Sequence, residues 1–364
     1  MKIYYLILAA ALLSSLKCAT GNGKTVGNLE FDSADGPYLF YEMNGINSYV
    51  GSVDNDGFQY KVQRLDSNAT VSVETPIEGL SFDVQIKSEH NIDTSHFNLP
   101  SKVFAISDVE GNFDFLYRIL IAQNIIDENL NWTFGDGHLV ILGDTFDRGN
   151  NVTQVLWLLY KLEQEAEAIG GKVHFILGNH ETMIMTGDDR YVHPKYQRVT
   201  QTLKQSYEDL FNSSTVLGDW LRSKNAIVTL GRLLFVHAGL SPALMMNELR
   251  PEKANNAIRS ALKKYGRQNL SSKEKLVFGS EGPLWYRDMV YRKIKNKDLI
   301  NILYYFQADH VIVGHTIVEE ISTAFEGKVI AIDVHRRKNQ PYQGLLIENG
   351  VFYVTNSLGE KQPL

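Results

Sequence analysis

Several apolar runs of this chain end abruptly in residues that can bind ions. The run from Leu139 to Leu142 is followed at once by Asp144, Asp147 and Arg148. A short apolar run bounded by turn residues is typical of a strand buried on both faces. Packing gives no reason for such a strand to end in two carboxylates and a guanidinium. Their position indicates that a charged ligand binds there.

Four further apolar runs end in the same way. The polar residues that follow them are, run by run, Asp108 and Glu110; Asn179, His180 and Glu181; His237; and His315. A single histidine after a strand is more often a hydrogen-bonded core residue than a ligand. Independent structural reasons for all five endings are hard to supply, and ligands of open α/β sheets gather at the carboxyl ends of the strands. The set therefore predicts one site.

The elements that position these residues follow an α/β pattern. After Leu99-Pro100, strand-like runs alternate with helical stretches. The segment from Gln154 to Ala168 repeats apolar residues at helical spacing, and Gly170-Gly171 ends it. Before this region, from about Leu29 to Lys87, short alternating runs predict a β-rich segment, with a hairpin turn at Asp54–Gly57. We expect that segment to serve packing or docking.

The N-terminus predicts export. The apolar stretch from Ile3 to Leu13 is too short to span a bilayer and fits the core of a signal peptide. We expect residues 1–21 to be removed and the protein to be periplasmic or secreted. Cys18 is the chain's one cysteine, which excludes an intramolecular disulfide. A lipid anchor on Cys18 is the alternative, but Lys17 departs from the usual lipoprotein signal.

Composition narrows the class of protein further. The 364 residues are 44% hydrophobic, enough to bury a sizeable core. The formal net charge is -6. Nucleic-acid-binding proteins usually carry a basic patch, so we do not expect nucleic acid as a partner. No second apolar run is long enough to span a membrane.

The motifs together resemble a known family. Gly-Asp-x-x-Asp-Arg-Gly, Gly-Asn-His-Glu, His-Ala-Gly and a final Gly-His are similar to the motif series of calcineurin-like metallophosphatases, in the phosphoprotein phosphatase branch. The segments Met185–Val192, Leu217–Val228 and Gly282–Arg287 resemble the Shewanella-like protein phosphatases. The resemblance implies a four-layer α/β/β/α sandwich for residues 100–364, after a β-rich segment at residues 22–99 that it does not cover.

The resemblance also implies a site for two divalent metal ions. Such ions polarise a phosphoryl oxygen and make a bound water nucleophilic near neutral pH. Asp144 would bridge both ions. The remaining ligands would be Asp108 and Glu110 for the first ion, and Asn179, His237 and His315 for the second. Oxygen and imidazole ligands suit Mn, Fe, Zn or Mg, of which we expect Mn.

Four residues would act on the substrate. Arg148 and Arg287 would hold the phosphate, since a planar guanidinium matches its oxygens. In the family, the position of His180 donates a proton to the leaving oxygen, and the position of Asp147 orients that imidazole. Two alternatives stay open: His180 without a role in proton transfer, and Arg287 as a surface ion-pair residue. Beside His180, a carboxylate at Glu181 can simply satisfy loop amides, and we do not expect it to be catalytic.

Glu110 departs from the family, which normally has histidine at this position. A carboxylate there would bring a negative charge to the first ion and weaken its Lewis acidity. We expect Glu110 to be a ligand, with a solvent-facing loop residue as the alternative. The predicted chemistry does not depend on which is correct.

Three functions follow from these motifs. The first is a phosphomonoesterase acting on phosphorylated proteins, on phosphotyrosine or phosphoserine and phosphothreonine. The second is a hydrolase of small phosphate esters or dinucleoside polyphosphates, and the third is a phosphate-binding protein without turnover. The insertion from His180 to Gly231 carries Arg190, Tyr191, His193 and Lys195. These residues are able to meet an anionic or aromatic substrate, although a solvated helical cover is an equal alternative.

Overall fold

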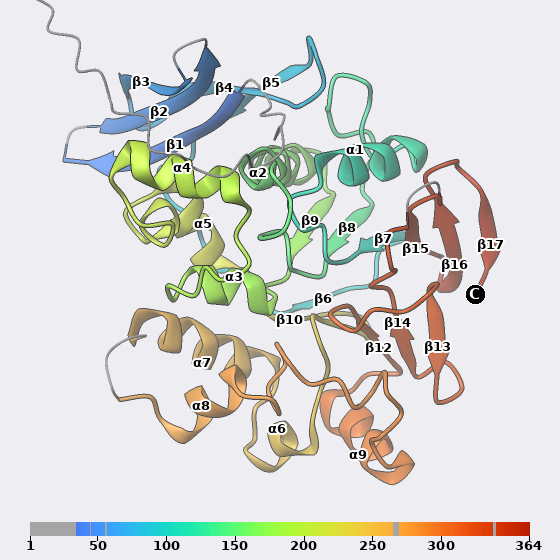
Figure 1. Cartoon of the computed structure of the whole chain (residues 1–364). Coiled ribbons are helices and arrows are strands. Elements are labelled where there is room, and N and C mark those ends of the chain that lie inside the picture. Colours follow the sequence, from blue (N-terminus) through green and yellow to red (C-terminus); the bar gives the residue numbers. More distant parts are fainter. Residues whose placement is uncertain (1–33, 44, 55–56, 265–268, 338–339) are drawn as a thin grey trace, which may run out of the picture. The chain divides into compact units, whose positions relative to one another are not determined.

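The computed structural model describes residues 34–43, 45–54, 57–264, 269–337 and 340–364 (Figure 1). The expected signal peptide at residues 1–21 and Cys18 lie outside the described residues. Within the described part of the chain, no helix combines the length and apolar character needed to cross a membrane. Helices and strands are both abundant, so the predicted α/β class is confirmed.

One six-stranded sheet has the order β17-β16-β15-β7-β8-β9. Its strands are β7 (Lys102–Ile106), β8 (His138–Ile141), β9 (Lys172–Phe175), β15 (Gln343–Glu348), β16 (Val351–Asn356) and β17 (Lys361–Pro363). β7, β8 and β9 are parallel neighbours. The chain returns between them through α1 (Phe113–Ala122) and α2 (Val152–Ala168), the latter matching the helix that the sequence predicted. The carboxyl ends of these strands therefore meet at one edge.

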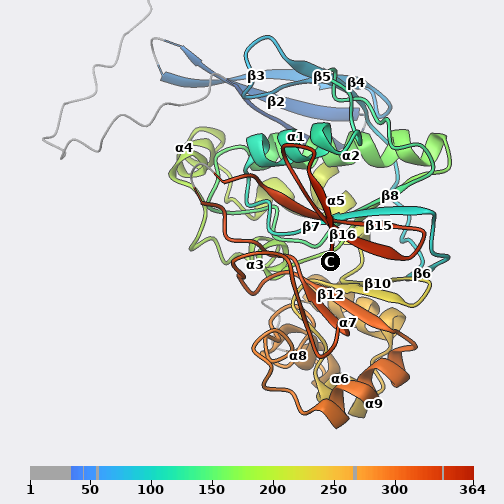
Figure 2. The same ribbon diagram turned by 90° about the vertical axis from the view of Figure 1, so that its right-hand side faces the viewer.

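The second six-stranded sheet has the order β13-β14-β12-β11-β10-β6. Its strands are β6 (His96–Phe97), β10 (Ile227–Leu230), β11 (Leu233–Val236), β12 (His310–Val313), β13 (Ser322–Ala324) and β14 (Val329–Ala331). Four helices accompany it: α6 (Pro242–Met246), α7 (Pro251–Lys264), α8 (Ser272–Phe278) and α9 (Asn296–Phe306). Figure 2 shows α1 and α2 beside the first sheet, and α6 to α9 beyond the second.

Alternation along the strands explains the layers. In β7, Val103 and Ala105 belong to the apolar cluster between the two sheets, whereas Phe104 and Ile106 belong to the cluster beneath the helices. Successive side chains of a strand point to opposite faces, so one short run serves two cores. Both faces of the sheet are covered, which gives the four-layer α/β/β/α arrangement that the sequence led us to expect.

The N-terminal strands form two small sheets. They are β1 (Ala34–Glu42), β2 (Gly45–Asp54) and β3 (Gly57–Leu65) in one sheet, with β4 (Thr70–Glu74) and β5 (Ser81–Gln85) in the other. The register pairs Asp54 with Gly57, which confirms the predicted hairpin. β1 packs against α2 and α5 (Val216–Ser223). Trp157 of α2 donates its indole N–H to the carbonyl of Pro37 at 2.9 Å. These contacts fasten the β-rich segment to the helices.

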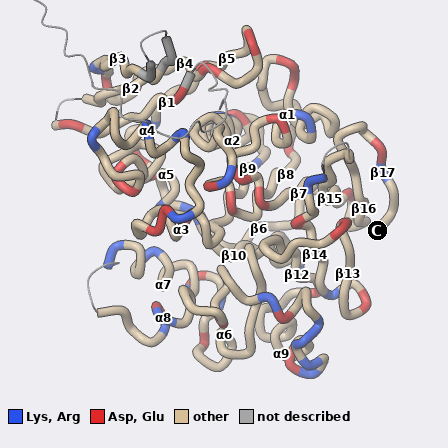
Figure 3. Tube along the Cα trace, in the orientation of Figure 1, with Lys and Arg blue, Asp and Glu red and all other residues tan. Residues whose placement is uncertain are grey.

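Charges are mixed along the described chain. Figure 3 shows Lys and Arg positions interspersed with Asp and Glu positions over helices and loops, in keeping with 36 basic and 42 acidic residues. Nucleic-acid-binding domains instead gather basic residues on one face or along one helix. The distribution in this view differs from that pattern.

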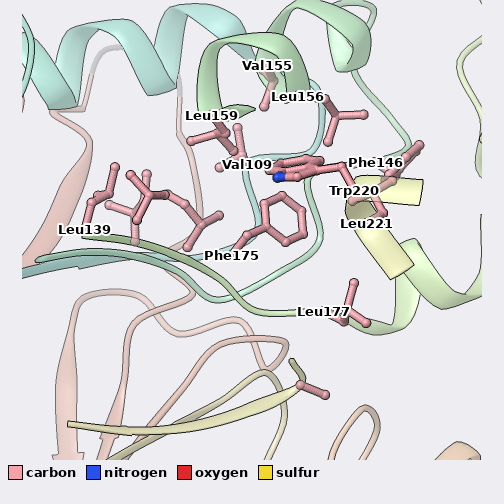
Figure 4. Close-up of a cluster of buried hydrophobic side chains, with 14 of the residues drawn as sticks. Val109, Leu139, Phe146, Val155, Leu156, Leu159, Phe175, Leu177, Trp220 and Leu221 are labelled. Atoms are coloured by element: carbon pink, nitrogen blue, oxygen red, sulfur yellow. The ribbon is translucent and has the colours of Figure 1, made fainter. Parts of the chain in front are cut away.

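Aromatic packing holds α2 and α5 against the first sheet. The rings of Phe175 in β9 and Trp220 in α5 lie 5.1 Å apart at 65°. Figure 4 shows both rings among aliphatic side chains that include Val155 and Leu159 of α2. Aromatic pairs of this geometry contribute about 0.5–1.5 kcal/mol beyond their burial. Tyr160 of α2 joins this packing, with its ring centroid 5.6 Å from that of Trp220, so α2, the helix that follows β8, lies against α5.

Candidate active site

The loops after five strands converge at one edge of the two sheets. Six of their residues have a positive φ, between 52° and 70°: Asp108, Glu110, Asp144, Asp147, Arg148 and His315. Such conformations are costly for non-glycine residues and cluster at functional sites. The loops after β8 and β9 also touch, since a Cβ on Gly143 would lie 2.4 Å from the amide nitrogen of Gly178. Glycine here permits the close approach that brings Asp144 beside the next loop.

His237 lies at the centre of a buried cluster. Its Nε2 atom is 2.9 Å from Oδ1 of Asn179, 3.2 Å from Nδ1 of His315 and 3.2 Å from Oδ2 of Asp144. All four side chains are at most 5% exposed. Among the described residues, Asp144, His237 and His315 form the group of carboxylates and imidazoles that lie close enough to share one ion.

The cluster fits a divalent metal ion. Ligands at about 2.1 Å from one ion lie about 3.0–3.4 Å from each other, which is close to the spacing around His237. The Nδ1 atom of His237 faces the carbonyl of Leu142 at 2.6 Å, an arrangement that leaves Nε2 for a metal. Carboxylate, amide and imidazole ligands together suit Mn, Fe, Zn or Mg. The residues expected for the second ion are thus brought together with Asp144.

The charges of the cluster favour a cation. Burial opposes protonation of His237, but the carboxylates of Asp144 and Asp108 outweigh it and raise its pKa to about 10. Burial disfavours the charged form of Asp144 as well, yet the adjacent imidazoles hold its pKa below the ordinary value. Opposite charges at these distances favour each other's ionised forms. The carboxylates therefore favour positive charge at this buried site.

His180 and Asp147 form a second feature beside the cluster. Nδ1 of His180 is hydrogen-bonded to Oδ2 of Asp147, and its Nε2 lies 3.8 Å from Oδ2 of Asp144. Burial lowers the pKa of His180, but the carboxylates of Asp144 and Asp147 overcome this and raise it. The imidazole is thus held by one carboxylate on one side and faces the cluster with its other nitrogen. This is the geometry of a proton donor with an orienting partner.

Glu181 holds the loops together. Its carboxylate accepts hydrogen bonds from the backbone N–H groups of Asp144, Thr145 and Gly178 at 2.7–2.8 Å, and from the hydroxyl of Thr145 at 2.7 Å. The side chain is fully buried. Its role is to satisfy loop amides, as we interpreted it from the sequence.

The two predicted phosphate-binding arginines approach the cluster from different loops. Arg287 donates from Nη1 to the carbonyl of His315 at 2.6 Å, which keeps its guanidinium beside the cluster. Arg148 is half-exposed and forms an ion pair with Glu110. Both side chains keep donors near the site, and a phosphate offers oxygens that match a guanidinium in pairs.

Asp108 and Glu110 differ in where the structure places them. Asp108 is buried, and its Oδ2 accepts hydrogen bonds from the backbone N–H of His315 at 3.0 Å and from the hydroxyl of Ser107. The sequence left Glu110 as a metal ligand or a solvent-facing residue. Its side chain is 19% exposed, and each of its carboxylate oxygens contacts an arginine, Oε1 with Arg148 and Oε2 with Arg336 at 2.7 Å.

Two residues at the site were missed by sequence reasoning. Asp333 and Arg336 follow β14 and lie near Asp108. Burial raises the pKa of Asp333 to about 8; Asp108 adds to this rise and Arg336 opposes it. The signal was present, because Val329–Ile332 is a sixth apolar run that ends in a carboxylate.

Of the four insertion residues considered as substrate contacts, only some lie near the candidate active site. The exposed Tyr191 lies with its ring centroid 5.5 Å from that of His180, and its carbonyl accepts a hydrogen bond from the backbone N–H of Arg148. Arg190 pairs with Asp188, and His193 caps α4 (Pro194–Leu203). Lys195 is only 2% exposed, so the idea that it meets the substrate is wrong.

A cleft of about 580 Å³ opens beside Arg148. Its walls include Glu110, Asn150 and Arg336 from the site loops. Pro76 and Ile77, from the turn between β4 and β5, line the same cleft. The β-rich segment therefore borders the space next to the candidate phosphate-binding residues.

Comparisons with known proteins agree with this geometry. The family model of the calcineurin-like phosphoesterases matches residues 101–319. A cold-active protein-tyrosine phosphatase of a psychrophilic Shewanella species has a crystal structure that matches with a TM-score of 0.82 and 34% sequence identity, over 91% of this chain and 99% of that one.

Curated relatives match over shorter lengths. The chain is 28% identical to Shewanella-like protein phosphatase 1 of Plasmodium berghei over 62% of this chain and 65% of that protein. It is 34% identical to Shewanella-like protein phosphatase 2 of Arabidopsis thaliana over 36% of this chain and 34% of that protein. The match of the family model to more than half of the chain, together with the clustered motif residues, shows that the chain belongs to the calcineurin-like phosphoesterases and hydrolyses phosphoric esters.

Proposed function

We propose that the protein is a metal-dependent phosphomonoesterase that acts on phosphorylated proteins, with phosphotyrosine among its substrates. The observation that carries this proposal is the pairing of His180 with Asp147 directly beside the cluster of Asp144, Asn179, His237 and His315. A protein that only bound phosphate would need no such pair.

The residues divide the reaction between them. Asp144, Asn179, His237 and His315 would hold a divalent ion, which would polarise a phosphoryl oxygen and lower the pKa of a nearby water. Arg148 and Arg287 bind the phosphoryl oxygens and position phosphorus for in-line displacement. The oxygen of a water bonds to phosphorus, and its protons stay with the released phosphate. As the bond between phosphorus and the ester oxygen breaks on the opposite side, His180 donates its Nε2 proton to the leaving oxygen. Asp147 accepts the Nδ1–H and keeps the imidazole oriented and charged.

Mn²⁺ is the metal that we propose. Imidazole and oxygen ligands in one cluster suit an ion of intermediate hardness, and Asp144 and Asn179 supply the oxygens. Zn²⁺, Fe²⁺ and Mg²⁺ are the alternatives to be compared in the same assay. The ligand set expected from the sequence is proposed here for Asp144, Asn179, His237 and His315; Asp108 and Glu110 are treated separately below.

The shape around the site supports a protein substrate. The cleft beside Arg148 is open and extends to the β4–β5 turn, which gives room for residues that flank a phosphorylated side chain. The exposed ring of Tyr191 near His180 offers a contact for an aromatic leaving group. The matching Shewanella structure is of a protein-tyrosine phosphatase, and both curated relatives carry the name of protein phosphatases.

The test compares substrates with and without metal. Chelator-treated protein would be assayed with and without Mn²⁺ on p-nitrophenyl phosphate, on phosphotyrosine and phosphoserine peptides of matched sequence, and on a phosphodiester. Mn²⁺-dependent release from monoesters, with peptides preferred, is the expected result. A preference for small esters or dinucleoside polyphosphates would favour the second function, and no turnover by folded protein with any metal would leave phosphate binding alone.

Export is part of the proposal as well. The apolar stretch from Ile3 to Leu13 supports a cleaved signal, with a periplasmic or secreted product. N-terminal sequencing of the mature protein and palmitate labelling would separate cleavage near residue 21 from acylation of Cys18. Recovery of uncleaved chain in the cytoplasm would contradict it.

A further inference from the structure

The two halves of the candidate metal site differ in how their ligands are engaged. On the His237 side, ligand atoms of Asn179, His315 and Asp144 lie within 3.2 Å of Nε2 of His237. On the Asp108 side, Oδ2 of Asp108 already accepts two hydrogen bonds, from His315 and Ser107. Among the described residues, neither Asp108 nor Glu110 joins the group close enough to share one ion.

Glu110 is occupied by arginine. Its two oxygens contact Nη1 of Arg148 and Nη2 of Arg336, the latter at 2.7 Å. A carboxylate that accepts hydrogen bonds from two guanidiniums is held strongly, because both bonds are charge-assisted. If Glu110 turned away to bind a metal, both arginines would lose an ion-pair partner, which is unfavourable for partly buried charges. The carboxylate of Glu110 is therefore satisfied by two arginines and needs no metal ion as a partner.

Arg336 is fixed in its position. Its side chain is 20% exposed, and the guanidinium lies 5.1 Å from the ring centroid of Phe115 in α1. The charges of Asp108 and Asp333 also act on this guanidinium. The guanidinium therefore interacts with three carboxylates, those of Asp108, Glu110 and Asp333. Their negative charges favour a positive group at this place.

We propose that the Arg336 guanidinium, held by Glu110, replaces the first of the two metal ions expected from the sequence. The chain then holds one divalent ion tightly, at Asp144, Asn179, His237 and His315. This accounts for the departure at position 110, because a carboxylate in place of the usual neutral histidine binds arginine as histidine does not.

The test counts ions and does not require turnover. Full-length protein would be loaded with Mn²⁺, freed of excess metal by gel filtration, and analysed by plasma mass spectrometry and electron paramagnetic resonance. We expect about one ion per chain, with the spectrum of an isolated Mn²⁺. Two tightly held ions, with the spectrum of an exchange-coupled pair, would overturn the proposal.

Variants test the role of the pair. Glu110→His combined with Arg336→Gln is expected to bind about two ions per chain, since it restores a neutral ligand and removes the competing charge. Arg337→Gln, which disrupts an exposed pair with Glu319, is the matched control and should bind as the wild type does. A folded double variant that still holds one ion would count against the proposal.

Folding of the double variant would be checked by circular dichroism. If it is unfolded, Arg336→Ala alone takes its place, with the same expected gain of a second ion and the same contrary result. The inference depends on the metal-binding part of the proposed function only. A protein that holds one ion but hydrolyses nothing would reject the proposed function and leave this inference standing.

Discussion

Nδ1 of His180 and Oδ2 of Asp147 share a hydrogen bond between side chains that are 5% and 0% exposed. The Asp147→Asn variant removes the charge that keeps the imidazole protonated. We expect kcat to fall about 100-fold on a phosphoserine peptide, because its alkoxide leaving group needs a proton. The fall on p-nitrophenyl phosphate should be much smaller, since p-nitrophenolate leaves without one.

The control for this prediction is His180→Ala, which should show the same dependence on leaving group. Steady-state kinetics on both substrates measure it. Equal losses of kcat on the two substrates would contradict proton donation and assign the pair to positioning.

Tyr191 is expected to discriminate between phosphorylated residues. Its exposed ring lies 5.5 Å from that of His180. Removing an aromatic contact costs about 0.5–1.5 kcal/mol, so Tyr191→Ala should lower kcat/KM on a phosphotyrosine peptide about 2- to 10-fold. The same peptide with phosphoserine should be nearly unaffected. Tyr304→Ala, at an 88% exposed position on α9, is the control. An equal loss on both peptides would argue against ring contact.

Lys195 joins the β-rich segment to a site loop. Its Nζ lies 2.8 Å from Oδ1 of Asp35 in β1 and donates to the carbonyl of Asn150 at 2.8 Å. Breaking a buried ion pair by removing one partner costs about 3–5 kcal/mol, so Lys195→Met should lower the free energy of unfolding in urea by that amount. Adding Asp35→Asn should recover part of the loss. A change below about 1 kcal/mol, typical of exposed pairs, would refute the burial of this pair.

Acid should destabilise the protein through a buried histidine, His174, and the partly buried His138 beside it. Nε2 of His174 lies 2.9 Å from Nδ1 of His138. Burial lowers the pKa of His138 to about 4 and that of His174 well below its ordinary value. Between about pH 6.5 and 4 the unfolded chain binds protons at these histidines and the folded chain does not. The free energy of unfolding therefore falls by about 1.4 kcal/mol for each histidine with every unit by which the pH is lowered. Above pH 7 this contribution is constant.

The melting temperature from pH 7.5 to 4 measures this effect. His174→Phe should flatten the profile, while His335→Gln, at an exposed position, should leave it unchanged. The prediction fails if the slope of the His174→Phe variant equals that of the wild type.

The sequence was most informative where the signal is local. Each strand ending shows its polar residue directly after an apolar run, and the helix from Gln154 to Ala168 shows its period within one segment. Parallel strands then bring such endings to a common edge, so Asp144, His237 and His315 could be placed together before the structure. The hairpin at Asp54 and Gly57 was likewise a local signal.

Long-range partners were not readable. Glu110 and Arg336 are 226 positions apart, and the sequence around either residue gives no sign that the two form a pair. Lys195 is a charged residue in an insertion, which favours a solvated position until its carboxylate partner in β1 is known. Asp333 differs from these residues, because the apolar run Val329–Ile332 directly before it was a local signal of the kind that marked the other strand endings.

The left-handed backbone of the site loops positions the functional side chains but lowers the stability of the protein. Each non-glycine residue in such a conformation costs of order 1–3 kcal/mol. Glu110 and His315 lack the small side chains that tolerate a left-handed backbone best. That cost is met by the packed sheets beneath. Selection for heat resistance alone would exchange these residues for glycine or asparagine and dismantle the site. A thermostable form of this protein should therefore be sought by changes in the helical layers, with the strand endings left as they are.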